Sequence, residues 1–428
     1  MRARLHFDRV APGGITLPFL LVAPFLGLLA VGLLLYAGDI VLASRWHPAL
    51  IGALHIYTIG FLLFTIAGVL LQIGPVLSAR PALQDERVAA RLRFVLGTGA
   101  VLLGCGLFHS MRVLLIPGVT LLALGLSAWL PIAIRGIGIA RPTRALLIAL
   151  TGLGIGAILG LRLALGHAFP SLGLPRHWTN IHAGWMLLGG IAPLVMAIGA
   201  VVIPMFQQTP VLPRFTKLLP ATAFTGMLIA MLPRVAVIGW ALAALALAVF
   251  AIVVLRAQTR RRNAGSDPTV ALFRQAMLAA LAGIIAWSAA LVFPEWQHRL
   301  QWTGAVLLIA GFAGGSVHGM MLKIVPFLVR LRLQRTLWEH SRPALNLPAF
   351  QQLLPRKLSR AIAPLHGSAV VLLTIAAVTP NRYTFLAAMT LLGTAQLALG
   401  ITAWSAVLRG AQFGAQTVAR HDIEENTT

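Results

Sequence analysis

Long apolar segments recur along this 428-residue chain, and they constrain its fold more than any other feature. Hydrophobic residues make up 58% of the sequence and charged residues only 10%. A helix needs about 20 mostly apolar residues to cross roughly 30 Å of hydrocarbon. Because helices satisfy all their own backbone hydrogen bonds in lipid, the sequence predicts an all-α, polytopic membrane bundle that forms one membrane domain.

Twelve spans are predicted, and the short connections 110–113 and 233–235 make antiparallel hairpins of their neighbours. The spans cover residues 15–36, 49–75, 93–110, 113–134, 145–167, 180–206, 216–233, 235–256, 271–293, 301–326, 361–380 and 383–407. A polar tail at 408–428 follows the last span and is predicted to be frayed.

Positive charges are concentrated in alternate loops. One set of flanks is rich in arginine, as at 80–93, 256–274 and 330–335, whereas the opposite flanks carry mostly single arginines. By the positive-inside rule, both termini are predicted to be cytoplasmic, in a bacterial inner membrane. Because membrane orientation accounts for the net charge of +24, no nucleic-acid partner is expected.

A similar five-residue pattern is found in the second, sixth and tenth spans. The three segments are IGPVL at 73–77, VIPMF at 202–206 and IVPFL at 324–328. Proline disrupts a continuing helix, so each pattern is predicted to end its span. The nearly equal spacing predicts three four-helix arcs as pseudo-repeats, approximately 15–134, 145–256 and 271–407. Glycines in these spans permit close helix packing and leave room for a flat macrocycle.

Histidines in the same three spans are candidate ligands. His55 and His182 lie near the outer ends of spans two and six, and His318 lies deep in span ten. Neutral imidazole binds heme iron, copper or zinc, and an ionisable residue inside a membrane is a functional candidate. These three are the predicted metal ligands, and His298 at the outer mouth is a further cofactor ligand. The partner of His55 stays open among His182, His298 and His318.

The twelve spans, the three arcs and these histidines resemble subunit I of heme–copper oxidases and the related NnrS-like membrane proteins. The resemblance covers nearly the whole chain, with motif support from residues 55–60 (HIYTIG) and 182–206. It implies heme b with an axial histidine from span two, and a copper ligand in span six.

The chain departs from the oxidases at their catalytic centre. Span ten has only His318 where the oxidases place two histidines, span seven has none, and spans six and seven have no tyrosine. Dioxygen reduction is therefore disfavoured, and whether the protein is an enzyme is left open.

Three further groups of residues carry expectations. Arg162 and Arg299 on the outer side are predicted to neutralise heme propionates. His318, Met320, Met321 and Met205 form a softer copper alternative, since thioether and imidazole suit Cu(I). Lys323 is predicted to extend to the membrane interface.

The functional expectation is a heme b-binding membrane protein in nitric oxide response, electron transfer or respiratory metal and heme homeostasis. Two alternatives are kept: a heme-free transporter or copper-handling permease, and a non-catalytic subunit of a respiratory complex. The expected partners are the lipid bilayer, a respiratory or electron-transfer protein and a second copy of the chain. The sequence identifies neither a substrate nor the number of cofactors.

Overall fold

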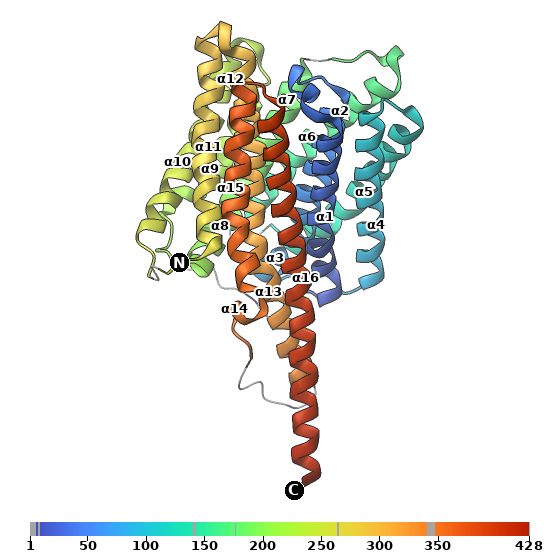
Figure 1. Ribbon diagram of the computed structural model, residues 1–428, viewed down its shortest axis with the longest axis vertical. Helices are drawn as coiled ribbons and strands as arrows, with labels where there is room; N and C mark the ends of the chain where they lie inside the picture. The colour runs from blue at the N-terminus through green and yellow to red at the C-terminus, as the bar shows by residue number, and fades with distance from the viewer. Residues whose placement is uncertain are drawn as a thin grey trace.

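The computed structural model describes residues 6, 9–139, 143–175, 177–262, 265–339 and 347–427, which form helices and connecting turns (Figure 1). The first half contains α1 (Gly13–Ala37), η2 (Gly38–Ala43), α2 (Pro48–His55), η3 (Ile56–Leu63), α3 (Phe64–Ser78), α4 (Glu86–Phe108), α5 (Arg112–Ile137), α6 (Arg144–Ala168), η5 (Pro170–Leu172), α7 (Trp178–Gly184), η6 (Trp185–Ile191) and α8 (Ala192–Gln207).

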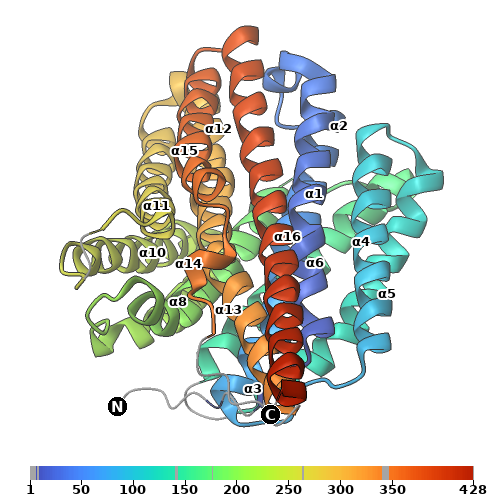
Figure 2. The same ribbon diagram turned by 60° about the horizontal axis from the view of Figure 1, so that its bottom comes forward.

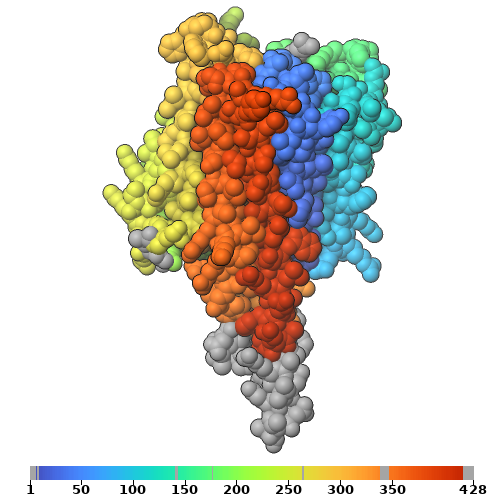
Figure 3. Space-filling view, viewed as in Figure 1, coloured from blue at the N-terminus to red at the C-terminus, as the bar shows by residue number. Residues whose placement is uncertain are grey.

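The second half contains η7 (Arg214–Lys217), α9 (Leu219–Ile229), η8 (Pro233–Val235), α10 (Ala236–Thr259), α11 (Pro268–Val292), η9 (Pro294–Trp296), α12 (Gln297–Val306), η10 (Leu307–Gly314), α13 (Gly315–Glu339), α14 (Phe350–Leu353), α15 (Arg356–Val378) and α16 (Arg382–Thr427). The last helix packs against the first, so α16 closes the bundle beside α1 (Figure 3).

Within the described residues, eleven helical segments are long and apolar enough to cross a membrane, as a multi-pass membrane protein requires. The predicted seventh span, 216–233, is the exception, because its helix α9 has only 11 residues. At 1.5 Å per residue it is about 16 Å long, which is shorter than the hydrocarbon layer. The α9–α10 pair nevertheless forms a hairpin that returns the chain to the end of α8. There, Arg262 N, just after α10, donates a hydrogen bond to Gln208 O, just after α8, at 3.0 Å.

Two helices extend beyond their predicted ends. The helix that contains Pro326 does not end there but runs to Glu339 as α13. The predicted frayed tail is instead helical as far as Thr427, in continuation of α16. Packing explains part of both extensions, since Gly414 of α16 lies against Leu333 of α13. Figure 2 shows α13 and the lower part of α16 meeting at this end of the bundle.

Lys323, which was predicted to extend to the membrane interface, forms an ion pair with Asp267. Its Nζ lies 2.8 Å from Asp267 Oδ2, and both side chains are partly buried. Asp267 also caps α11, because its other carboxylate oxygen accepts a hydrogen bond from Thr269 N. The carboxylate therefore connects the start of α11 to α13.

Spans two, six and ten form the centre of the bundle. The buried shares of their apolar windows are 78%, 61% and 67%, higher than in the other candidate spans. Each of the three also contains one π-helical segment: η3, η6 or η10. In spans two and six the helix continues one turn past the proline and ends before a left-handed residue, Ala79 or Gln208.

Close packing of α6 against span six depends on glycine. A Cβ on Gly152 would overlap the carbonyl oxygen of Gly189. We expect Gly152→Ala to lower the free energy of unfolding by about 1 to 3 kcal/mol, because backbone atoms cannot rotate away from the added methyl group. Gly154→Ala is the control, since its Cβ would meet open space. Thermal unfolding in detergent measures both, and equal midpoints would show that this packing is less tight than described.

Candidate functional site

His55 and His182 face each other near one end of the bundle, although 127 positions separate them in the sequence. His55 ends α2, and His182 lies in α7. The centroids of their imidazole rings are 6.3 Å apart, and the ring planes are inclined by only 6°. This separation is too large for face-to-face contact, which needs about 3.5 to 4.0 Å. The two rings are thus nearly parallel but do not stack directly.

Backbone carbonyl groups fix the orientation of both rings. His55 Nδ1 lies 2.7 Å from Ile51 O, and His182 Nδ1 lies 2.8 Å from Gly156 O. A carbonyl oxygen only accepts hydrogen bonds, so each neutral ring carries its proton on Nδ1. The lone pair of each Nε2 is then available to a ligand. This is the usual arrangement of a metal-binding histidine, whose second nitrogen donates to a backbone or carboxylate oxygen.

The ring separation fits two nitrogens bound to one metal ion from opposite sides. A metal–nitrogen bond is about 2.0 to 2.1 Å, and an imidazole centre lies about 1.1 Å from each ring nitrogen, so two trans ligands have centroids about 6.3 Å apart. The observed separation is 6.3 Å. In separation, therefore, the pair is compatible with two imidazoles that would hold one metal centre between them.

Local backbone structure helps to place both histidines. The π-helical segment η3 begins at Ile56, directly after His55, and η6 begins at Trp185, three residues after His182. Such segments often occur at functional sites, because the extra residue changes the direction of neighbouring side chains. Gly160 of α6 provides space for the second ring: a Cβ there would lie 2.7 Å from His182 Cε1.

The two imidazoles fit a heme better than a bare metal ion. Among the described residues, no group of three or more His, Cys, Asp or Glu side chains is arranged to hold a metal. An ion held by two trans histidines lacks its remaining ligands, whereas a porphyrin supplies four nitrogens in the plane between the rings. Both residues are of intermediate exposure.

Arg45 is connected by a hydrogen bond to the helix that carries His182. Its Nη1 donates a hydrogen bond to Asn180 Oδ1 at 2.9 Å, two residues before His182, and its guanidinium lies over the Trp46 ring. Burial lowers the pKa of the Arg45 guanidinium from its ordinary value, yet arginine keeps its charge at neutral pH. Arg45 thus joins the turn before α2 to the start of α7.

The two arginines predicted to bind propionates have other contacts. Arg162 donates hydrogen bonds from Nη1 to Gly173 O and from Nη2 to Leu172 O, which fixes the loop after α6. Arg299 is exposed, and its guanidinium lies over Trp296. The described contacts therefore connect Arg45, rather than Arg162 or Arg299, to the helix that carries His182.

The other predicted ligands lie apart from this pair. His298 is exposed, with its ring near Trp302. His318 is buried in α13, where its ring lies 4.6 Å from that of His366 and 5.2 Å from that of Phe61, measured between centroids. Of the three partners that the sequence left open for His55, the structure places His182 beside it.

The neighbour of His318 is His366, which was not predicted from the sequence. His366 comes from α15, in the predicted span 361–380, and it belongs to none of the three related spans. Helix-to-helix distances decide this contact, and no sequence pattern encodes them directly.

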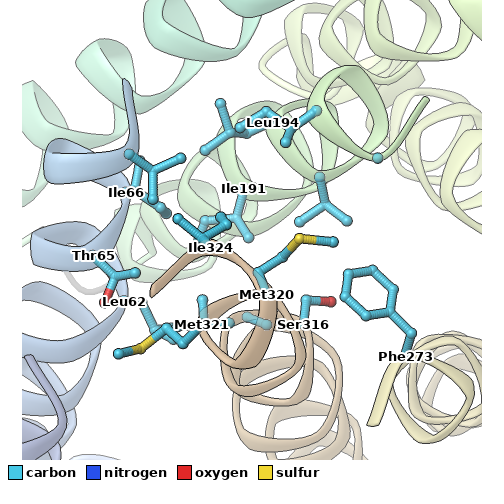
Figure 4. Close-up of a pocket in the computed structure, with 16 residues that line it drawn as sticks. Leu62, Thr65, Ile66, Ile191, Leu194, Phe273, Ser316, Met320, Met321 and Ile324 are labelled. Atoms are coloured by element: carbon cyan, nitrogen blue, oxygen red, sulfur yellow. The ribbon is translucent and has the colours of Figure 1, made fainter. Parts of the chain in front are cut away.

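The copper alternative of His318 with three methionines is not assembled. Met320 and Met321 line an apolar cavity of about 70 Å³ between spans two, six and ten, together with Ile66, Ile191 and other apolar side chains (Figure 4). Met205 is 37% exposed near the lower end of span six. Cavities with such walls stay dry and accept small apolar molecules, so this space does not suit a metal ion.

No family model, curated protein or solved structure matches this chain. A functional assignment therefore depends on the geometry of the molecule. The pair of His55 and His182, with parallel rings and Nδ1 bonded to backbone carbonyl groups, is the arrangement used for that assignment.

Proposed function

We propose that this protein is a heme b-binding membrane protein in which His55 and His182 are the two axial ligands. The observation that carries the proposal is the pair of parallel rings at 6.3 Å, each with Nδ1 held by a backbone carbonyl group. It supports a shared metal between the two Nε2 atoms, with a flat macrocycle in the plane between the rings.

Electron transfer is the activity that this ligand set favours. A heme with two histidine ligands supplies reversible one-electron chemistry, and its iron has no open position for dioxygen or nitric oxide. The two histidines come from spans whose ends are joined by the Arg45–Asn180 hydrogen bond. A rigid ligand pair of this kind would keep the same coordination in both oxidation states. This lowers the reorganisation energy of electron transfer.

The surrounding residues have distinct tasks in this proposal. Ile51 O and Gly156 O hold the two imidazoles in the tautomer whose Nε2 can bind a metal. Arg45 supplies positive charge that offsets the carboxylates of a bound heme. Gly160 keeps room for the His182 ring, and replacing it would move a ligand without removing one.

The proposed architecture is three four-helix arcs, similar to subunit I of heme–copper oxidases and to NnrS-like proteins, with both termini cytoplasmic in a bacterial inner membrane. Two features support the repeat: a π-helical segment in each of spans two, six and ten, and the matching left-handed residues after the helices that contain Pro75 and Pro204. The proposed partner is a respiratory electron-transfer protein that approaches the end of the bundle near His55 and His182.

A visible spectrum of the purified protein tests the proposal. We expect dithionite reduction to produce sharp b-type bands, the pyridine hemochrome to give one heme b per chain, and carbon monoxide to leave the reduced spectrum unchanged. The last result follows because two histidines fill both axial positions. A folded protein that stays colourless after expression with added heme would refute the proposal, and strong carbon monoxide binding would refute the two-histidine ligation.

A further inference from the structure

A second histidine pair, His318 and His366, lies buried in the bundle and takes no part in the proposed heme site. Their exposed fractions are 0% and 1%, and their ring centroids are 4.6 Å apart. His318 belongs to α13 and His366 to α15, so two helices from different parts of the sequence bring the rings together.

Backbone hydrogen bonds again determine which nitrogen is free. His318 Nδ1 lies 2.8 Å from Gly314 O, and His366 Nε2 lies 3.1 Å from Ala310 O. Each neutral ring therefore donates to a carbonyl group of span ten and keeps a lone pair on its other nitrogen. These two atoms, His318 Nε2 and His366 Nδ1, have no hydrogen-bond partner among the described residues.

The hydroxyl group of Tyr57 is a third buried polar atom without a partner in the described structure. A Cβ on Gly314 would overlap this hydroxyl and lie 3.6 Å from His366 Nε2, so Tyr57 and His366 both border the space left by that glycine. A buried polar group without a hydrogen bond costs about 1 to 3 kcal/mol. The nitrogen of His366 on this side is the one that donates to Ala310 O, so the two free imidazole nitrogens, rather than Tyr57, indicate a ligand.

The free atoms define the chemistry of that ligand. Two imidazole lone pairs require a hydrogen-bond donor or a Lewis acid, and Tyr57 has only one proton to donate. Transition-metal cations such as copper and zinc bind neutral imidazole readily. A cation bonded to one nitrogen of each ring at about 2.0 to 2.1 Å, with an angle of about 90 to 110°, gives centroids about 4.5 to 5.2 Å apart.

We infer that His318 and His366 hold a transition-metal cation in a cis arrangement through their two free ring nitrogens, with water as a further ligand. The centroid separation of 4.6 Å lies in the range expected for cis coordination, whereas the 6.3 Å of the first pair fits trans coordination. The cis arrangement does not suit the two axial ligands of a heme, so this site is chemically distinct and does not depend on the proposed function.

Metal binding by the full-length protein tests this inference. Protein without a histidine tag is treated with a chelator, incubated separately with Cu⁺ under reducing conditions and with Zn²⁺, desalted and analysed by mass spectrometry for metal per chain. We expect one cation of at least one of these metals per chain, with two imidazole ligands in its X-ray absorption spectrum. His318→Leu and His366→Leu should each reduce the bound metal by at least about tenfold.

Controls separate a lost ligand from a lost fold. His298→Leu removes an exposed histidine and should leave the metal content unchanged. Unaltered metal content in monodisperse His318→Leu and His366→Leu proteins would overturn the inference, and so would a folded wild-type protein that binds neither metal, in which case a buried water bridges the rings.

Discussion

Replacing His182 with alanine is expected to convert a six-coordinate heme into a five-coordinate one that binds carbon monoxide in its reduced state. The reason is the ring geometry: His55 and His182 lie at the separation of two trans ligands, and loss of one Nε2 opens one axial position. His55→Ala should have the same effect from the other side. The double variant should contain no heme above the background of the purification.

Two control variants distinguish this ligand pair from the alternatives that the sequence leaves open. His298→Ala and His318→Ala each remove a histidine that was a candidate partner of His55, and both should keep the two-histidine spectrum. Spectra of the reduced proteins with and without carbon monoxide, normalised to protein, make the comparison. An unchanged spectrum in His182→Ala together with an altered one in either control would show that the ligands are assigned wrongly.

The membrane class and most span positions were predictable, because lipid imposes a simple length requirement on apolar helices. The seventh span shows where that requirement is insufficient. Residues 216–233 are mostly apolar, but the α-helix covers only Leu219–Ile229, with Pro220 in its first turn and its end before Pro233. Hydropathy measures composition, and it does not register how many residues are helical before a proline.

The proline pattern predicted helix ends only in part. Pro75 and Pro204 each lie one turn before a helix end, whereas α13 continues past Pro326 for 13 residues, to Glu339. Packing accounts for the difference, since Arg335 of α13 donates a hydrogen bond to Val10 O and Leu333 packs against α16. Tertiary contacts can stabilise a helix beyond a proline that would end it in isolation.

Candidate ligands were predictable as residue types, but their pairing was not. His55, His182 and His318 were singled out by their place in three related spans, and that place says nothing about ring orientation. The sequence placed His318 deeper in the membrane than His55. In the structure the two rings belong to different pairs, His55 with His182 and His318 with His366. His366 could not be paired with His318 from the sequence, because α15 carries no counterpart of the repeated pattern.

A single methyl group on α6 is expected to disturb the site without removing any ligand. Gly160→Ala would place its Cβ 2.7 Å from His182 Cε1 and 3.1 Å from His182 Nδ1. The ring must then move, and the hydrogen bond from His182 Nδ1 to Gly156 O, now 2.8 Å, must lengthen or break. Loss of such a supporting contact typically weakens metal binding by about 10- to 100-fold, so we expect the heme content of the purified protein to fall by a comparable factor.

Gly154→Ala is a matched control for this variant, because Gly154 lies in the same helix and its Cβ would meet open space. Both substitutions replace glycine with alanine inside a helix, which favours the helix by about 1 kcal/mol in each case. A difference in heme content between the two variants therefore reports on contact with His182 and not on helix stability. Equal heme content, measured by pyridine hemochrome on monodisperse protein, would show that His182 does not need its described position and would count against its role as an axial ligand.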